Sequence, residues 1–352
     1  MRRRVWLVLL VIVTVLAAGD WAYWQMATQR LRQAINQWED DLRAKGWEVG
    51  AGALSDSGWP VAARVSVANL TLRHGPQTVP GLIEVTAPVV TLSLPVIQPA
   101  EPRVIIDGPV HVRVDGLQDM VVTADQLVLG IRLRRSGPAP VSLRGQDTRL
   151  EAADGSWRTA VRQLTADASL DEVAGNGQSD CVAEFQVHAE GITLPPHMKW
   201  PLGQAVAVLQ MQGVVHGPLP AAGPVTPAIT PWAETWRNNG GSVEISHFVA
   251  DWGPLALTGS ATLALDEQLQ PMGTGTAHLV GYAEALDRFA AAGLMTRSAA
   301  TAAKAVLSLM AGVGEGDVPP AVDVPLTLQY RTLSMRQVPL VRFPELDWPP
   351  AR

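Results

Sequence analysis

Residues 255–265 read LALTGSATLAL, and this stretch shows how the body of the chain is built. Its leucines occupy alternate positions, and its threonines and its serine fall on the positions between them. Side chains alternate between the two faces of a β-strand, so this pattern gives one apolar face and one polar face. The stretch therefore predicts an antiparallel strand that is covered on one side only.

The same alternation appears in other parts of the chain. Valines alternate with His111 and Arg113 over residues 110–114, and similar patterns occupy residues 127–134 and 324–329. Roughly a dozen such strands are readable, which is more than a flat sheet carries without curling or splitting. We therefore predict a mainly β fold of the α+β class, built on a large curved antiparallel sheet.

A curved sheet with one apolar face either packs a dry core or encloses a groove for an apolar ligand. The sequence leaves both alternatives open, because periodicity shows which residues point inward and not what fills the inside. Leucines at inward positions of the two clearest stretches form the predicted lining of such a groove. They are Leu127, Leu129, Leu133, Leu255, Leu257, Leu263 and Leu265.

The N-terminus has the features of a membrane-directed segment. Arginines at positions 2–4 precede an apolar run over residues 5–18. As a helix this run rises only about 21 Å, short of the ~30 Å hydrocarbon core, which suits a signal peptide cleaved near residues 15–17. The segment continues to Trp24, however, and then spans about 30 Å and ends in aromatic residues that favour a membrane surface. We predict a retained transmembrane anchor over residues 1–24, with cleavage as the alternative.

The distribution of positive charge predicts the orientation of this anchor. Arginines precede the span, and none follows it until Arg30. Because positive charge is retained on the cytoplasmic side, we expect a single pass through the inner membrane, with a cytoplasmic N-terminus and the body in the periplasm.

Residues 25–45 are predicted to continue as an amphipathic helix. Its apolar stripe repeats at helical spacing. The stripe consists of Trp24, Leu31, Ile35, Trp38 and Leu42. We expect it to pack on the sheet, with a membrane-surface or partner-binding helix as the alternative.

The rest of the chain divides at a proline-rich stretch, since proline continues neither a helix nor a central strand. Residues 46–216 form the predicted N-terminal β half, residues 217–240 a proline-rich linker with a short helix, and residues 241–352 the C-terminal β half. Within the last, residues 282–311 combine alanines with apolar residues at helical spacing. We predict a helical segment there that packs on the sheet.

Composition and spacing give no catalytic or metal-binding pattern. The net charge of −6 is opposite in sign to what phosphate neutralisation requires, so nucleic acid is not an expected partner. The single cysteine excludes an intrachain disulfide, and the seven histidines lack the spacing that places two imidazoles on one metal ion. We predict no cofactor, no metal site and no enzymatic activity, with a hydrolase whose catalytic residues only the fold brings together as the alternative.

Short motifs of glycine, tryptophan and proline follow one another along the chain. They are Gly58-Trp59-Pro60, Trp236, Gly240-Gly241, Trp252-Gly253-Pro254, Gly259, Asp266, Pro271 and Gly273. With the N-terminal anchor, this order resembles the alphaproteobacterial family of domain of unknown function 2125, over nearly the whole chain. The resemblance implies a membrane-anchored envelope protein and supplies no catalytic residue. The chain departs from the family's glycine-rich final turn, where Arg331 and Arg336 stand.

The pattern L-x-G-x-x-x-L-x-L-D that begins at Leu257 is also similar to strands of the AsmA-like envelope proteins. Their curved sheets are associated with lipid handling, and the likeness is an analogy at the level of the fold. It favours the first of two expected roles, in which the groove shields lipid or another apolar ligand during envelope biogenesis. The second is a structural or adaptor role, in which the chain recruits an envelope protein and holds no ligand.

Overall fold

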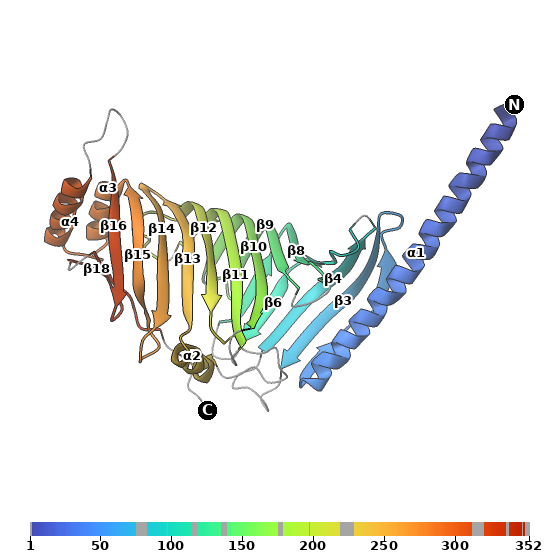
Figure 1. Ribbon diagram of the computed structural model, residues 1–352, viewed down its shortest axis with the longest axis horizontal. Helices are drawn as coiled ribbons and strands as arrows, with labels where there is room; N and C mark the ends of the chain where they lie inside the picture. The colour runs from blue at the N-terminus through green and yellow to red at the C-terminus, as the bar shows by residue number, and fades with distance from the viewer. Residues whose placement is uncertain are drawn as a thin grey trace.

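One antiparallel sheet makes up the body of the computed structural model (Figure 1). The structure describes residues 2–74, 83–96, 98–114, 118–134, 139–174, 179–196, 198–218, 229–311, 320–335, 338–346 and 348. The strands are β1 (Trp47–Gly50), β2 (Leu54–Ser57), β3 (Ala62–His74), β4 (Ile83–Pro95), β5 (Arg103–Asp107), β6 (Val110–Val114), β7 (Met120–Thr123), β8 (Gln126–Ile131), β9 (Val141–Ala152), β10 (Arg158–Ala174), β11 (Ser179–Thr193), β12 (Ala205–His216), β13 (Ser242–Trp252), β14 (Leu255–Leu265), β15 (Pro271–Val280), β16 (Ala321–Gln329), β17 (Thr332–Met335) and β18 (Val338–Arg342).

The strands follow one another across the sheet in a meander. β1 and β2 lie end to end beside β3, and the broken strands β5–β6 and β7–β8 fill the space between β4 and β9. From β9 to β18 each strand pairs with the next, always antiparallel. Figure 1 shows β3 and β4 inclined to the later strands, so the sheet bends. The predicted mainly β fold with a large antiparallel sheet is confirmed.

Left-handed residues inside strands keep apolar side chains on one face. Asn69, with a φ of 49°, lies between Val67 and Leu70 in β3. Val67 and Leu70 are three residues apart, yet both belong to one apolar cluster. Asp147 adopts the same conformation in β9, with a φ of 46°. Asn and Asp reach positive φ more easily than other side-chain-bearing residues, so each slips the alternation by one position at small cost.

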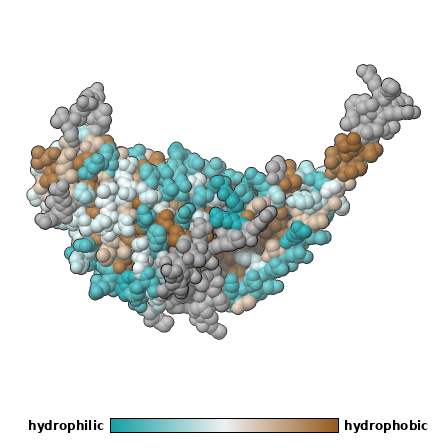
Figure 2. Space-filling view, in the orientation of Figure 1, coloured by the Kyte–Doolittle hydropathy of each residue, from teal (hydrophilic) through white to brown (hydrophobic). Residues whose placement is uncertain are grey.

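A single helix, α1 (Arg2–Ala44), contains both the predicted anchor and the predicted amphipathic helix. Its N-terminal part projects away from the sheet, and Figure 2 shows brown apolar surface there. The apolar side chains from Leu10 to Leu16 are between 49% and 66% exposed. Among the described residues, α1 is the one helix long and apolar enough to cross a membrane, and a signal sequence has the same properties.

The C-terminal part of α1 packs on the sheet. Ala27, Leu31 and Ile35 are buried in a cluster with β3 side chains such as Val65. Of the predicted apolar stripe, Leu31 and Ile35 are therefore packed on the sheet, whereas Trp38 is 43% exposed. The strands also begin directly after this helix, at Trp47.

The predicted linker over residues 217–240 is described only in part, because residues 219–228 lie outside the described ranges. Helix α2 (Ile229–Asn238) supplies the predicted short helix, and the left-handed Gly240 follows it with a φ of 76°. Strand β13 then pairs along β12. The two predicted halves therefore share one sheet.

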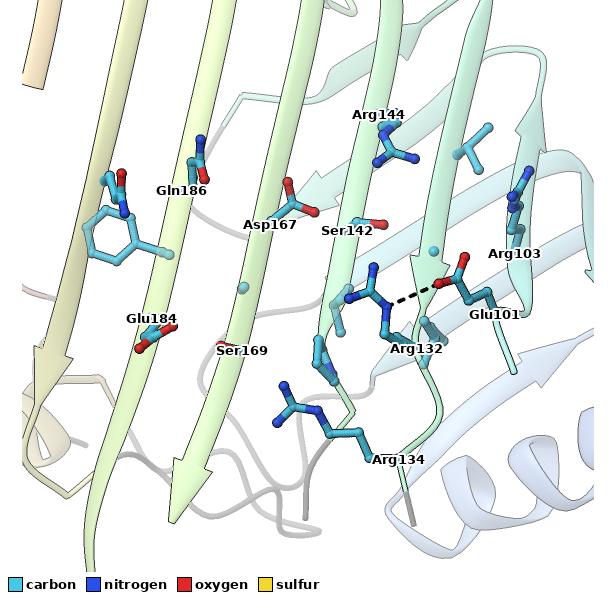
Figure 3. A pocket seen from close by; sticks show the side chains of 18 of the residues that line it. Glu101, Arg103, Arg132, Arg134, Ser142, Arg144, Asp167, Ser169, Glu184 and Gln186 are labelled. Carbon is cyan, nitrogen blue, oxygen red and sulfur yellow. Dashed lines mark hydrogen bonds and ion pairs between the residues drawn. The ribbon is translucent and has the colours of Figure 1, made fainter. Parts of the chain in front are cut away.

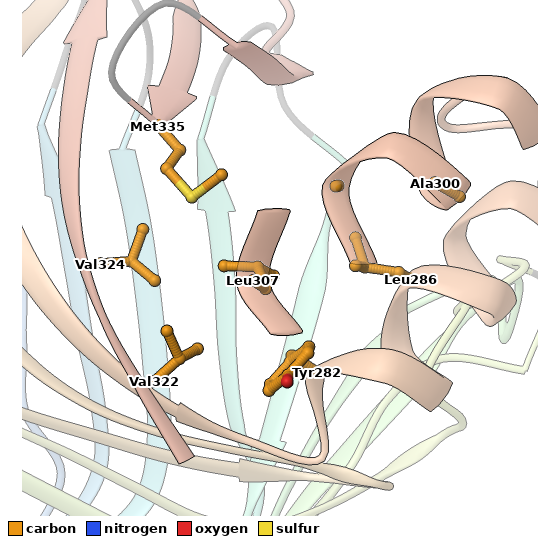
Figure 4. Close-up of a cluster of buried hydrophobic side chains, with 8 residues drawn as sticks. Tyr282, Leu286, Ala300, Leu307, Val322, Val324 and Met335 are labelled. Atoms are coloured by element: carbon orange, nitrogen blue, oxygen red, sulfur yellow. The ribbon is translucent and has the colours of Figure 1, made fainter. Parts of the chain in front are cut away.

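Two helices, α3 (Tyr282–Ala291) and α4 (Arg297–Met310), form the predicted helical segment of residues 282–311. They cover the C-terminal end of the sheet (Figure 4). The buried residues of this contact are Tyr282, Leu286, Ala300, Ala303, Leu307, Val322, Val324 and Met335. The prediction that helices pack on the sheet here is confirmed.

This cluster should carry a measurable part of the stability. Leu307 is 3% exposed, so Leu307→Ala leaves a cavity under α4 and should lower the free energy of unfolding by about 2–5 kcal/mol. Leu309 lies on the same helix and is 87% exposed, so Leu309→Ala should change it by less than about 0.5 kcal/mol. Urea denaturation of both variants measures the difference, and equal losses would contradict the packing of α4.

The hairpin between β16 and β17 shows how the chain turns where Arg331 stands. Gln329 pairs with Thr332, so Tyr330 and Arg331 form a two-residue loop. Their φ values are 49° and 63°, the left-handed pair that a type I′ turn requires. Arg331 also forms an ion pair with Glu345 at 3.0 Å. Two bulky residues thus hold a conformation that glycine or asparagine adopts more easily. Arg336 lies outside the described residues.

Replacing Tyr330 should therefore stabilise the chain. Tyr330 is 80% exposed, so Tyr330→Asn loses little packing and relieves left-handed strain, for a gain of about 0.5–1 kcal/mol. Chemical denaturation gives the difference. Gln329→Asn, placed in the extended strand beside the turn, is the matched control and should bring no gain. A loss of stability in Tyr330→Asn would refute the strain argument.

Candidate functional site

One face of the sheet carries a continuous row of apolar residues. In an antiparallel pair, residues directly opposite each other point to the same face. Following the pairing from β3 to β16 gives a row in which each residue opposes the next. The row is Val65, Leu92, Val104, Leu129, Leu143, Ala166, Val187, Met211, Phe248, Gly259, Ala277 and Val324. We call the side of the sheet that carries it the apolar face.

Within the described residues, helices cover the apolar face at its two ends. Val65 belongs to the cluster under α1, and Val324 to the cluster under α3 and α4. The main helix-to-strand packing is α1 on β1 and β3, α3 on β14, and α4 on β16. Between these ends, side chains such as Leu129, Leu143 and Phe248 remain half-buried rather than buried. In the part of the chain that the structure describes, no helix packs on the middle of the apolar face.

A hollow of about 210 Å³ lies on the apolar face beside the C-terminal helices. Phe248, Leu257, Leu263, Leu326 and Leu328 are among its lining residues. Three glycines also line it, and they are Gly259, Gly273 and Gly275. Because its side chains are almost wholly hydrocarbon, the hollow offers dispersion contacts and few hydrogen bonds to an occupant.

The glycines at this hollow have no room for a side chain. A Cβ at Gly259 would lie 2.4 Å from the Thr276 carbonyl oxygen, and one at Gly273 would lie 2.1 Å from the Thr262 carbonyl oxygen. Strands β14 and β15 therefore approach too closely for any other residue. The close approach accounts for two of the family-motif glycines and keeps the hollow free of side chains.

The structure brings most of the predicted groove residues to the apolar face. Leu257 and Leu263 line the hollow. Leu255 and Leu265 occupy the same alternation near the two ends of β14, and Leu127 precedes Leu129 by two positions on β8. Leu133 does not join them, because β8 ends at Ile131 and the Leu133 side chain is 56% exposed.

Sequence reasoning missed several residues of the apolar row. Phe248 was missed because the β12–β13 and β13–β14 pairings are irregular between residues 245 and 248, which breaks the alternation. Leu143 and Met211 belong to short alternations that could have predicted them, since Val141 and Leu143 alternate with Ser142 and Arg144, and Leu209 and Met211 alternate with Gln210 and Gln212. The pairing register then places both residues in the row.

The opposite face carries a polar groove of about 620 Å³ (Figure 3). Arg144, Asp167 and Gln186 line it, each one position away from a residue of the apolar row. On one side of this groove, Arg132 donates to Glu101, with 3.1 Å between Nε and Oε1. Charged side chains of both signs keep this face hydrated, so it does not suit an apolar ligand.

Among the described residues, no group of three or more His, Cys, Asp or Glu side chains is placed to hold a metal ion. The apolar face is therefore the feature of the described chain with the clearest binding chemistry.

A family model described as "Uncharacterized protein conserved in bacteria (DUF2125)" matches residues 24–344. The chain belongs to the DUF2125 family. The predicted family resemblance is confirmed. No curated protein and no solved structure matches the chain. The likeness to AsmA-like proteins is not shown by these comparisons and stays an analogy.

The tryptophans of the DUF2125 motif fasten connections between strands. Trp236 Nε1 donates to the His216 carbonyl oxygen at 2.9 Å, and Trp252 Nε1 donates to the Gly203 carbonyl oxygen at 2.7 Å. Gly241 lies against the Trp236 ring, where a Cβ would come within 2.2 Å of it. These residues hold the ends of β12, β13 and α2 together.

Other DUF2125 motif residues shape turns. Gly58, with a φ of 94°, opens the turn between β2 and β3 that continues through Trp59 and Pro60. Gly253 has a φ of 60° and precedes Pro254 between β13 and β14. Pro271 is the first residue of β15, a position that requires no backbone donor at the strand start. The motif thus encodes sheet geometry.

Asp266 stabilises the turn between β14 and β15. Its Oδ1 accepts hydrogen bonds from the backbone N–H groups of Gln268 and Gln270, at 2.9 and 2.8 Å. Gln270 is 5% exposed and exchanges hydrogen bonds with the backbone of Leu346, which ties the C-terminal segment to this turn.

Removing the Asp266 carboxylate should therefore loosen both the turn and the C-terminal segment. We expect Asp266→Ala to lower the free energy of unfolding by about 1.5–3 kcal/mol, since hydrogen bonds to a charged acceptor are lost. Asp266→Asn keeps an acceptor oxygen and should lose less. Chemical denaturation compares the two, and equal stability of the alanine variant and the native chain would rule out this role.

Proposed function

We propose that this DUF2125 chain is an inner-membrane-anchored periplasmic protein whose apolar face shields lipid acyl chains or a similar apolar ligand during envelope biogenesis. The observation that carries the proposal is the apolar row, which twelve strands supply and which helices cover only at its ends within the described residues.

The energetics of the open face favour an apolar occupant. Each Å² of apolar surface removed from water is worth roughly 25 cal/mol, and large exposed apolar patches on soluble proteins mark interaction sites. The half-buried side chains of Leu129, Leu143 and Phe248 gain this energy only if something packs on them. A flexible hydrocarbon chain can follow such a row across several strands without needing a hydrogen-bond partner.

The position of α1 supports the location in the envelope. Its exposed segment from Leu10 to Leu16 suits a bilayer, and the arginines at positions 2–4 favour a cytoplasmic N-terminus. The same helix packs directly on β3, where the apolar row begins. Under this proposal the apolar face starts beside the membrane that supplies its ligand.

The adaptor role is the second candidate, and one observation favours it. Leu294, Val306 and Leu309 are 54%, 37% and 87% exposed at the C-terminal helices. Figure 2 shows brown surface at this end of the molecule, opposite the projecting helix. An exposed apolar patch of this kind also suits a protein partner.

Site-specific photo-crosslinking distinguishes the two roles. A photoreactive phenylalanine analogue is placed at Leu129 or at Leu257 in the full chain, in living cells. The matched controls are Val128 and Thr258, the adjacent residues that point to the polar face of the same strands. We expect lipid adducts several-fold more abundant at Leu129 and Leu257 than at the controls, because acyl chains lie on the apolar face.

Mass spectrometry of the purified adducts measures the outcome. Equal lipid labelling on the two faces would overturn the proposal. A discrete protein adduct at Leu129 and Leu257 in place of lipid would support the adaptor role. Circular dichroism of each variant confirms that the sheet has formed, so that loss of labelling is not mistaken for unfolding.

A further inference from the structure

The turn between β2 and β3 is fixed against the helix that leaves the sheet. Trp24 Nε1 of α1 donates to the carbonyl oxygen of Ser57, the last residue of β2, at 3.3 Å. Two turns of helix further on, Arg32 forms an ion pair with Asp56 at 2.9 Å. The hydrogen bond that Arg32 donates to the Asp56 carboxylate raises the pKa of Arg32 above its ordinary value. These two contacts therefore fix the position of the β2–β3 turn along the axis of α1.

The position of the turn along α1 places its tip near the predicted membrane surface. The turn reaches about two residues, or roughly 7 Å, beyond Ser57. The same distance along α1 corresponds to about four or five residues before Trp24. The tip is therefore level with Gly19 and Asp20, just inside the predicted aromatic end of the span at residues 21–24.

The tip is apolar and exposed. Trp59 is 50% exposed and Val61 is 68% exposed. At the same level on α1, Trp21 and Tyr23 are 54% and 41% exposed. Tryptophan and tyrosine concentrate at membrane interfaces, since their rings accept both the headgroups and the hydrocarbon boundary. The β2–β3 turn and α1 thus present aromatic side chains at a similar position along the helix axis.

We propose that the β2–β3 turn, through Trp59 and Val61, enters the headgroup region of the bilayer that α1 crosses and forms a second membrane contact. A single helix leaves the body free to rotate about the helix axis, whereas two contacts fix its orientation. The N-terminal end of the apolar face then stays next to the membrane surface. This inference rests on the anchor in the proposed function and does not depend on a ligand.

Fluorescence from a single labelled position tests this contact in the full chain. Val61→Cys is introduced in a Cys181→Ser background, labelled with an environment-sensitive dye, and reconstituted into vesicles of phosphatidylethanolamine and phosphatidylglycerol. The matched control is Tyr330→Cys, which lies in another exposed hairpin turn, between β16 and β17. Spin-labelled lipid should quench the dye several-fold more strongly at position 61 than at position 330, and emission at position 61 should shift to the blue.

A second label at Trp59→Cys provides an independent reading of the same tip. Quenching at positions 59 and 61 no stronger than at position 330 would overturn the inference. That result would leave the lipid crosslinks at Leu129 and Leu257 unaffected, so failure of the membrane contact and failure of the proposed function are separate outcomes.

Discussion

Antiparallel pairing in one continuous register is the constraint on which the rest of the structure depends. Because side chains alternate along a strand, a slip of one residue in any pair would move an apolar residue to the polar face. At Asn69 and Asp147 a left-handed backbone shifts the alternation within the strand while the pairing register stays constant. Around Phe248 the pairing itself shifts register. These local irregularities keep twelve strands contributing to a single apolar row.

A single sheet cannot cover its own apolar face, so other elements must pack on that face to bury it. Globular domains usually bury the apolar side of a sheet under a second layer. Here α1 provides that layer at one end, and α3 and α4 provide it at the other. The two hydrophobic clusters that helices cover therefore lie at the two ends, and the half-buried side chains between them are where an occupant would add contacts. This distribution separates the parts that stabilise the fold from the part available for binding.

The glycine, tryptophan and aspartate residues on which the family resemblance was drawn shape the backbone of this chain and carry no reactive chemistry. Gly259 and Gly273 permit the close approach of β14 and β15, Trp236 and Trp252 fasten strand connections, and Asp266 closes a turn. Residues on the apolar face need only be apolar and of suitable size, so many substitutions satisfy them.

Period and hydropathy are local properties of the chain, so they were enough to predict the strands with clear alternation, the apolar N-terminal segment and the helices of residues 282–311. The pairing of the strands, and the position of Leu143 and Met211 on one face with Leu257, followed from the folded chain alone. So did the coverage of this face, which helices of the described residues provide at its two ends. Leu133 shows where prediction from the sequence pattern fails. The apolar alternation continues to this residue, although β8 ends at Ile131. Register and coverage depend on residues far apart in sequence, and no local pattern contains them.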